Sequence, residues 1–234
     1  MRRWRRGRVA AVLGLVGVIA LLGGLLALSR TAVFRARTIR VEGNVHLRDA
    51  DVLRIAGIDD QTNVVHLDTD LAVRALTADP WIRSASVTRE LPSTVVIRIE
   101  ERIPVATVNA RAVTADGIVL PGASIVGLAA IRSSDGTALE NDWQGAASAI
   151  GDLPPLLRRR VAVAVVEPDG AIFLAMTVGP DVVWGLPGEG SEKVVALLAV
   201  LQWAAGEERR VSRVDVSVPS APAATMADGS TVGL

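Results

Sequence analysis

The sequence lacks cysteine and tyrosine and has only two phenylalanines, two histidines and one lysine, Lys193. The absence of cysteine excludes disulfide bonds, thiol catalysis and cysteine-ligated metal sites. The 25 basic and 25 acidic residues cancel, so no excess of positive charge indicates a nucleic-acid partner. Because aromatic residues are so scarce, a folded core must consist mostly of Val, Leu, Ile and Ala, with Trp as the large filler.

Charged and strongly polar side chains are also missing from one long stretch, residues 9–28 (VAAVLGLVGVIALLGGLLAL). A helix of this length is about 30 Å long, which is roughly the thickness of a bilayer core. A surface helix of a soluble protein would keep a polar face. We therefore expect residues 9–28 to form a transmembrane helix.

The flanking charges predict the orientation of this span. Five arginines lie within residues 1–8, and positively charged flanks stay in the cytoplasm. We therefore expect a short cytoplasmic stub (1–8), with the bulk of the chain extracytoplasmic. A cleaved signal peptide is an alternative, although its apolar region is normally only about 7–15 residues long. Nucleic-acid binding by the arginine cluster is another alternative.

A small α+β unit is predicted after the span. Strand patterns occur at residues 38–41, 82–89 and 94–101, and helix patterns follow Asp49 and either Asp68 or Asp70. Pro80 disfavours helical geometry in the residue before it, so the second helix must end near Asp79. The predicted order is β-α-α-β-β, with the helices on one face of the sheet.

Five sequence runs follow the predicted span in order: residues 39–44 (IRVEGN), 68–70 (DTD), 79–82 (DPWI), 85–92 (ASVTRELP) and 101–106 (ERIPVA). Through these runs the unit resembles the POTRA domain of the FtsQ/DivIB family of bacterial cell-division proteins, and we place the domain at residues 33–103. The last run, at the exit of the domain, is the most specific.

The resemblance extends over a second, mixed β-rich domain, which we place at residues 104–218. Strands are predicted at 104–109, 161–166, 171–178, 182–184 and 211–218, a hairpin at 112–120, and helices at 142–150 and 191–205. Residues 121–141 have a loop-like composition. Residues 219–234 are rich in Pro, Ala, Ser, Thr and Gly, and we expect a disordered tail.

No arrangement of residues predicts catalysis. His46 and His66 stand alone, without any H-x-x-x-H, H-E-x-x-H or G-x-S-x-G motif. Glu100 and Glu101 are adjacent on a predicted strand, so their side chains point to opposite faces and do not form an acid/base pair. The glycines at 185–190 lack the G-K-[ST] of a phosphate loop. We expect a protein that is not an enzyme and that binds no cofactor, metal or small-molecule substrate.

The resemblance implies a scaffold of the septal cell-wall machinery in the plasma membrane. It implies contacts with FtsB/DivIC-like and FtsL-like single-span proteins, and indirect contacts with FtsW/FtsI-like synthases. We expect the strand at 211–218 to form a sheet edge that pairs with a partner, with Val214 and Val216 facing the core. The candidate partner-binding residues are Trp184, Lys193, Trp203, Arg213, Asp215 and Ser217.

Two other functions fit parts of the sequence. One is a membrane-anchored POTRA module that guides unfolded chains, as in outer-membrane assembly, but no barrel-length amphipathic tract follows the domain. The other is a membrane-anchored envelope enzyme, which the missing catalytic residues disfavour.

Overall fold

The computed structural model describes residues 2–137, 139 and 142–234, although the side chains of residues 2–13, 25, 28 and 32 are not described. The chain divides into two compact units, the first ending at Glu101 and the second beginning at Arg102. Each unit has its own buried core. The protein belongs to the α+β class, as predicted.

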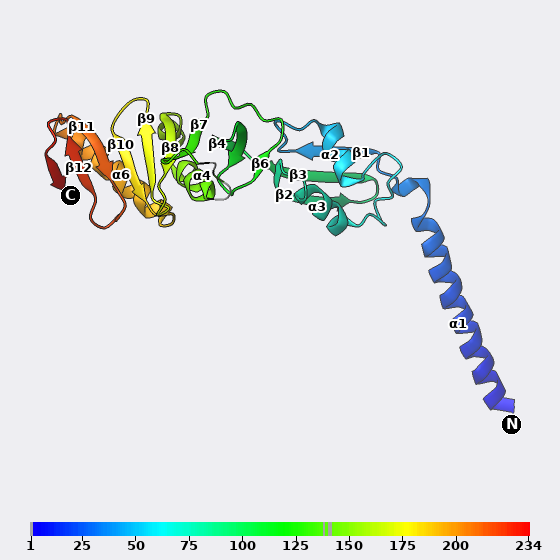
Figure 1. Ribbon diagram of the computed structural model, residues 1–234. Coiled ribbons are helices and arrows are strands. Elements are labelled where there is room, and N and C mark those ends of the chain that lie inside the picture. Colours follow the sequence, from blue (N-terminus) through cyan, green and yellow to red (C-terminus); the bar gives the residue numbers. More distant parts are fainter. Residues whose placement is uncertain (1, 138, 140–141) are drawn as a thin grey trace. The chain divides into compact units, whose positions relative to one another are not determined.

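The first unit follows the predicted β-α-α-β-β order (Figure 1). Its elements are α1 (Arg2–Ser29), the 3-10 helix η1 (Ala32–Phe34), β1 (Thr38–Glu42), α2 (Asp49–Ala56), α3 (Thr69–Thr77), β2 (Ile82–Glu90) and β3 (Thr94–Glu101).

Local sequence signals explain where the two short helices begin and end. The Asp68 carboxylate accepts a hydrogen bond from the Leu71 N–H at 2.9 Å and caps α3 as predicted. Helix α3 ends at Thr77, ahead of Pro80. Helix α2 ends at Ala56 and is capped by Gly57, whose N–H donates to the Arg54 carbonyl. Asp49 is the first residue of α2 rather than its cap.

The small sheet has the strand order β1-β3-β2, with β1 parallel and β2 antiparallel to the central β3. On β3, Val95, Ile97 and Ile99 are buried in a core to which Val52 of α2 and Leu76 of α3 also contribute. The alternate face of the sheet is largely polar, although Val96 on that face is only 2% exposed; there Arg98 Nε lies 2.7 Å from Glu42 Oε2. This is the half-buried sheet that the alternating sequence predicts.

Helix α1 leads into the first sheet. Within the part of the chain whose side chains are described, no helix is long and apolar enough to be assigned as a membrane span. The predicted span at 9–28 falls partly on residues 9–13, 25 and 28, which lie outside those described side chains. At the end of α1, the Asn63 side chain donates to the Ser29 carbonyl at 2.8 Å, and Ser29 Oγ lies 3.1 Å from His66 Nε2.

The second unit is built around one ten-stranded sheet. Its elements are β4 (Pro104–Val108), β5 (Arg111–Thr114), β6 (Val119–Leu120), β7 (Ala129–Ser133), α4 (Trp143–Asp152), α5 (Pro155–Arg158), β8 (Val161–Val166), β9 (Ile172–Met176), β10 (Asp181–Gly185), α6 (Gly190–Gly206), β11 (Val211–Asp215), β12 (Ala223–Met226) and β13 (Thr231–Gly233).

The sheet order is β13-β12-β11-β10-β9-β8-β7-β4-β5-β6, so the strands from β7 onward lie side by side in chain order (Figure 1). The pairs β4–β7, β7–β8 and β10–β11 are parallel, and the others are antiparallel. Parallel neighbours need a crossover connection. Helices α4 and α5 lie between β7 and β8, and α6 lies between β10 and β11.

The core of the second unit lies between this sheet and the two longer helices. Ile150 of α4 and Leu197 of α6 are at most 1% exposed and belong to the same cluster as Trp184, Val214 and Val216. The predicted inward orientation of Val214 and Val216 is confirmed.

The segment at 121–141, which the sequence predicted as loop, contains a central strand. Residues 129–133 form β7, which pairs with β4 on one side and with β8 on the other. Ala129 and Ile131 are each 4% exposed. A strand between two parallel neighbours is buried and does not alternate polar and apolar residues clearly. The sequence of β7 therefore could not be distinguished from the Gly- and Ser-rich loop residues on either side of it.

The C-terminal segment at 219–234 is likewise not a disordered tail. Residues 223–226 form β12, which pairs with β11, and residues 231–233 form β13, which pairs with β12. Ala224 is fully buried and Met226 is 7% exposed. Asp228-Gly229 between alternating residues is a hairpin signal that the composition-based prediction overlooked. Burial of this alternate row offsets the weak strand propensity of the segment.

Candidate protein-binding surface

Trp184 and Lys193 are part of the core rather than of the surface. Trp184 is 1% exposed and Lys193 is 2% exposed. The Lys193 ammonium donates to the Leu186 carbonyl at 2.6 Å and lies 5.8 Å from the centre of the Trp184 ring. A buried charge needs such partners, and a ring face attracts a cation. Neither Trp184 nor Lys193 is therefore accessible to a partner protein.

Trp203 and Arg213 remain accessible, but on different elements. Trp203 of α6 is half-buried against the core, and the Arg209 guanidinium lies 5.9 Å from its ring centre. Arg213 of β11 is exposed and lies 5.3 Å from the ring centre of Phe173, on the strand face opposite Val214. Cation–π contacts of this kind hold an arginine in place while leaving it reachable.

Asp215 and Ser217 bond to each other. The Asp215 carboxylate accepts the Ser217 N–H at 2.9 Å and the Ser217 hydroxyl at 2.6 Å. This turn ends β11 against Gly185, whose φ is +75° and where a Cβ would lie 2.6 Å from the Ser217 Cβ. Only glycine combines this conformation with such a close approach. Both half-buried side chains thus shape the end of β11.

Strand β11 is not the edge that the sequence predicted. It pairs with β10 on one side and with β12 on the other, so its backbone groups are used within the sheet. Edge position depends on which strands follow, and the composition of residues 219–234 predicts disorder where the structure has β12 and β13. Among the described residues, the ends of the large sheet are β13 and the two-residue strand β6.

The β13 edge offers backbone groups at two positions. Met226 N donates to the Ser230 carbonyl and Leu234 N donates to the Pro222 carbonyl, while Val232 pairs with Ala224 midway between them. Antiparallel ladders alternate between hydrogen-bonded and non-hydrogen-bonded pairs. The N–H and C=O groups of Thr231 and Gly233 therefore point away from β12 and are available to another strand.

A broad groove lies on the outer side of α6. It has a volume of about 880 Å³ and runs between α6 and the connection from β11 to β12. Val195 and Val218 line it and are 68% and 55% exposed, and Glu189 and Glu192 make it acidic. The sequence gives no sign of this groove, because its two walls are far apart in the chain.

The first unit offers a contrasting, closed arrangement around Glu101. The Glu101 carboxylate accepts hydrogen bonds from the backbone N–H groups of Val45, His46 and Leu47 at 2.7–3.0 Å. The His46 ring stacks on Trp81 with 3.7 Å between ring centres. Trp81 is 9% exposed and is therefore a buried residue of the first unit.

Neither histidine belongs to a site with catalytic or metal-binding geometry. His46 stacks on Trp81, and His66 contacts Ser29. Within the described ranges, no group of three or more His, Asp or Glu side chains could hold a metal ion. The surface features described above are an open strand edge, an acidic groove and exposed arginines.

Comparison with known proteins relates both units to one family of proteins. The family described as "POTRA domain, FtsQ-type" matches residues 34–102. The Cell division protein FtsQ of Corynebacterium glutamicum is 26% identical, over 91% of this chain and 96% of that protein. The Cell division protein FtsQ of Streptomyces venezuelae is 28% identical, over 96% of this chain and 87% of that protein.

A third relative is more similar over a shorter range. The Cell division protein FtsQ of Syntrophotalea carbinolica is 34% identical over 45% of this chain, and the match spans 40% of that relative's length. The family match falls on the β-α-α-β-β unit, and the longer alignments run through both units. The chain belongs to the FtsQ family of cell division proteins and carries an FtsQ-type POTRA domain.

Proposed function

We propose that this protein is a non-enzymatic scaffold of the bacterial division machinery that gathers septal cell-wall synthesis proteins through extracytoplasmic contacts. Membership of the FtsQ family, a non-catalytic division protein family, supports the role. The observation that carries the mechanism is the β13 edge, where Thr231 and Gly233 present backbone groups to solvent. No cofactor or small-molecule substrate is part of the proposal.

The proposed topology is a single pass. Residues 1–8 are cytoplasmic, residues 9–28 span the plasma membrane, and residues 33–103 and 104–233 form the extracytoplasmic domains. The length and apolarity of residues 9–28 and the five preceding arginines support this orientation. Alkaline phosphatase fused after residue 110 should be active, and an inactive fusion there would reverse the orientation.

Partner binding is proposed to occur by strand addition at β13. An extended segment of an FtsB/DivIC-like or FtsL-like protein forms backbone hydrogen bonds with Thr231 and Gly233 and continues the sheet. FtsW/FtsI-like synthases are then reached indirectly, through these single-span partners. Backbone pairing gives affinity but little selectivity, so side chains near the edge must choose the partner.

The acidic groove beside α6 is suited to that selection. Residues 217–222, which form one of its walls, lead directly into β12. A partner with an apolar face next to basic residues would bury Val195 and Val218 and face Glu189 and Glu192. Exposed Arg213, on the opposite sheet face, is a weaker candidate contact.

The decisive experiment is replacement of Thr231 by Pro. Its N–H points away from β12, so proline removes an outward donor without breaking a bond of the ladder. We expect pull-down of the FtsB-like partner to fall at least tenfold while the melting temperature holds. The matched control, Thr231→Val, keeps the N–H and should bind normally.

Unchanged binding by a folded Thr231→Pro protein would move the interface away from β13. Val195→Glu and Arg213→Glu then test the groove and the opposite sheet face separately. A fluorescent fusion of the full chain should concentrate at the septum, and uniform membrane fluorescence would contradict the division role.

A further inference from the structure

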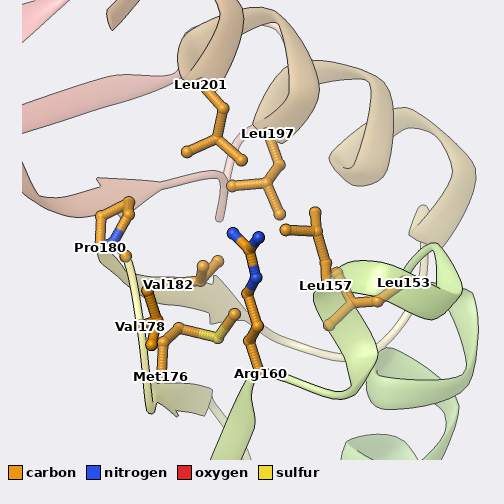
Figure 2. Close-up of a pocket in the computed structure, with 10 residues that line it drawn as sticks. Leu153, Leu157, Arg160, Met176, Val178, Pro180, Val182, Leu197 and Leu201 are labelled. Atoms are coloured by element: carbon orange, nitrogen blue, oxygen red, sulfur yellow. The ribbon is translucent and has the colours of Figure 1, made fainter. Parts of the chain in front are cut away.

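A small apolar pocket in the second unit, open to solvent at its rim, is lined by one charged side chain. The pocket has a volume of about 30 Å³ and lies between α5, the turn that joins β9 to β10, and α6. Figure 2 shows its walls, which include Leu157, Met176, Val178, Leu197 and Leu201. Among the side chains that line it, only Arg160 is charged or polar.

The Arg160 guanidinium is directed into this ring of apolar side chains. In Figure 2 it lies between Leu157 and Val182 and points towards Leu197. No hydrogen bond or ion pair of this guanidinium is found within the described part of the chain. An arginine keeps its charge at every physiological pH and presents a planar fork of donors that matches a carboxylate. The site therefore supplies a cation without an anion.

The volume limits what can enter. About 30 Å³ corresponds to room for about two water molecules. A buried water needs two to four polar partners, and these walls offer it only the guanidinium. An apolar group of similar size, such as the branched end of a Val side chain, matches the site better, whereas an acyl chain is too large. Val178 at the rim is 65% exposed, so the pocket can be reached from solvent.

We propose that this pocket is a docking point for a partner polypeptide that presents a Glu or Asp side chain beside a short branched aliphatic one. The aliphatic side chain fills the space against Met176 and Leu197, and the carboxylate pairs with the Arg160 guanidinium. The pair is partly desolvated by the pocket walls, which strengthens it relative to a pair in open water. The pocket shares no residue with the β13 edge, so it does not depend on the proposed function.

The methionines allow a direct test on the full chain in lipid nanodiscs. The sequence has three, of which Met176 lines the pocket and Met226 belongs to the distant strand β12. The probe is a blocked Ala-Glu-Val-Ala tetrapeptide, titrated into protein with isotope-labelled Met methyl groups. We expect the Met176 signal to shift and saturate with a Kd of about 1 mM or lower, while the Met226 signal stays fixed.

Two further peptides separate charge from shape. Replacing Glu by Gln, or Val by Gly, in the tetrapeptide should weaken binding at least fivefold. Equal shifts with the Gln peptide, or no movement of the Met176 signal with any peptide, would overturn the proposal. A larger Met176 shift with octanoate than with the peptide would assign the site to a fatty acid and overturn it as well.

The matched variants are Arg160→Gln and Arg159→Gln. Both positions are exposed, but only Arg160 lines the pocket. We expect Arg160→Gln to lose the preference for the Glu peptide over the Gln peptide, with an unchanged Met226 signal and melting temperature. Arg159→Gln should keep that preference. An Arg160→Gln protein that still discriminates between the two peptides would contradict the assigned role of the guanidinium.

Discussion

Both units use a single charged side chain to hold a loop, but in opposite surroundings. In the first unit, the half-buried Glu101 carboxylate accepts three backbone N–H groups from residues 45–47. In the second, the Lys193 ammonium is 2% exposed and donates to one carbonyl, that of Leu186. The Glu101 carboxylate has three hydrogen-bond donors and remains partly accessible to solvent. The ammonium depends on one bond and one ring, so the second unit should tolerate change less well.

The strongest test of this comparison is Lys193→Glu. The substitution places an unpaired carboxylate against the Leu186 carbonyl and the Trp184 ring, and burying an uncompensated charge costs about 3–5 kcal/mol. Lys193→Met keeps the length but leaves the carbonyl without its donor, at a cost of about 1–3 kcal/mol. Chemical denaturation followed by Trp fluorescence measures both changes.

Glu192→Gln, at the exposed neighbouring position, is the control and should stay within about 0.5 kcal/mol of the wild type. If Lys193→Glu were as stable as this control, the ammonium would not be a structural anchor.

A smaller effect is expected for Glu101→Gln in the first unit. Hydrogen bonds to a charged group contribute about 1.5–3 kcal/mol, and glutamine retains one acceptor oxygen, so the loss should lie at the lower end of that range. Amide hydrogen exchange at residues 45–47 should accelerate. The control is Glu100→Gln on the exposed sheet face, and equal acceleration in both variants would rule out a specific role for Glu101.

The smallest effect concerns the pH dependence at Asp116. Burial raises the pKa of Asp116, but hydrogen bonds from Thr114 and Arg102 outweigh it, and the pKa lies below its ordinary value of about 3.9. The resulting stabilisation is present above the unfolded pKa and is lost as the pH falls through the folded pKa. Because the carboxylate is 40% exposed, we expect less than about 1 kcal/mol.

The measurement is the difference in unfolding free energy between the wild type and Asp116→Asn, from neutral pH down through the unfolded and folded pKa values of Asp116. The wild type should be more stable near neutrality, and the difference should shrink with acid. A difference that grows with acid would contradict the direction of the pKa shift.

The β-α-α-β-β part of the first unit could be predicted well from its sequence, because its signals are local. The alternation of Val95, Ile97 and Ile99, the cap at Asp68 and the stop at Pro80 each act within a few residues. The second unit was predicted less well where position depends on distant partners. Strand β7 is defined by β4 and β8 on either side, and nothing within residues 129–133 reveals that they are central.

The candidate surface was harder to predict than the fold for the same reason. Whether β11 is an edge depends on whether β12 pairs with it, and Lys193 is buried only because Leu186 and Trp184 converge on it. A lysine on a helix is most often exposed, so the residue type of Lys193 predicted a surface position, which is wrong. The groove and the Arg160 pocket join elements separated in the chain and have no sequence signature.

The parallel pairing of β1 with β3 has a mechanical consequence. The chain enters the small sheet at Thr38 and leaves it at Glu101, and these residues lie at opposite ends of the paired strands. Tension applied between the two ends of the sheet therefore pulls β1 and β3 past each other along their length. The interstrand hydrogen bonds over the register from Thr38–Thr94 to Glu42–Arg98 then carry the load together instead of opening one at a time. A domain connected in this way resists pulling in shear along β1 and β3.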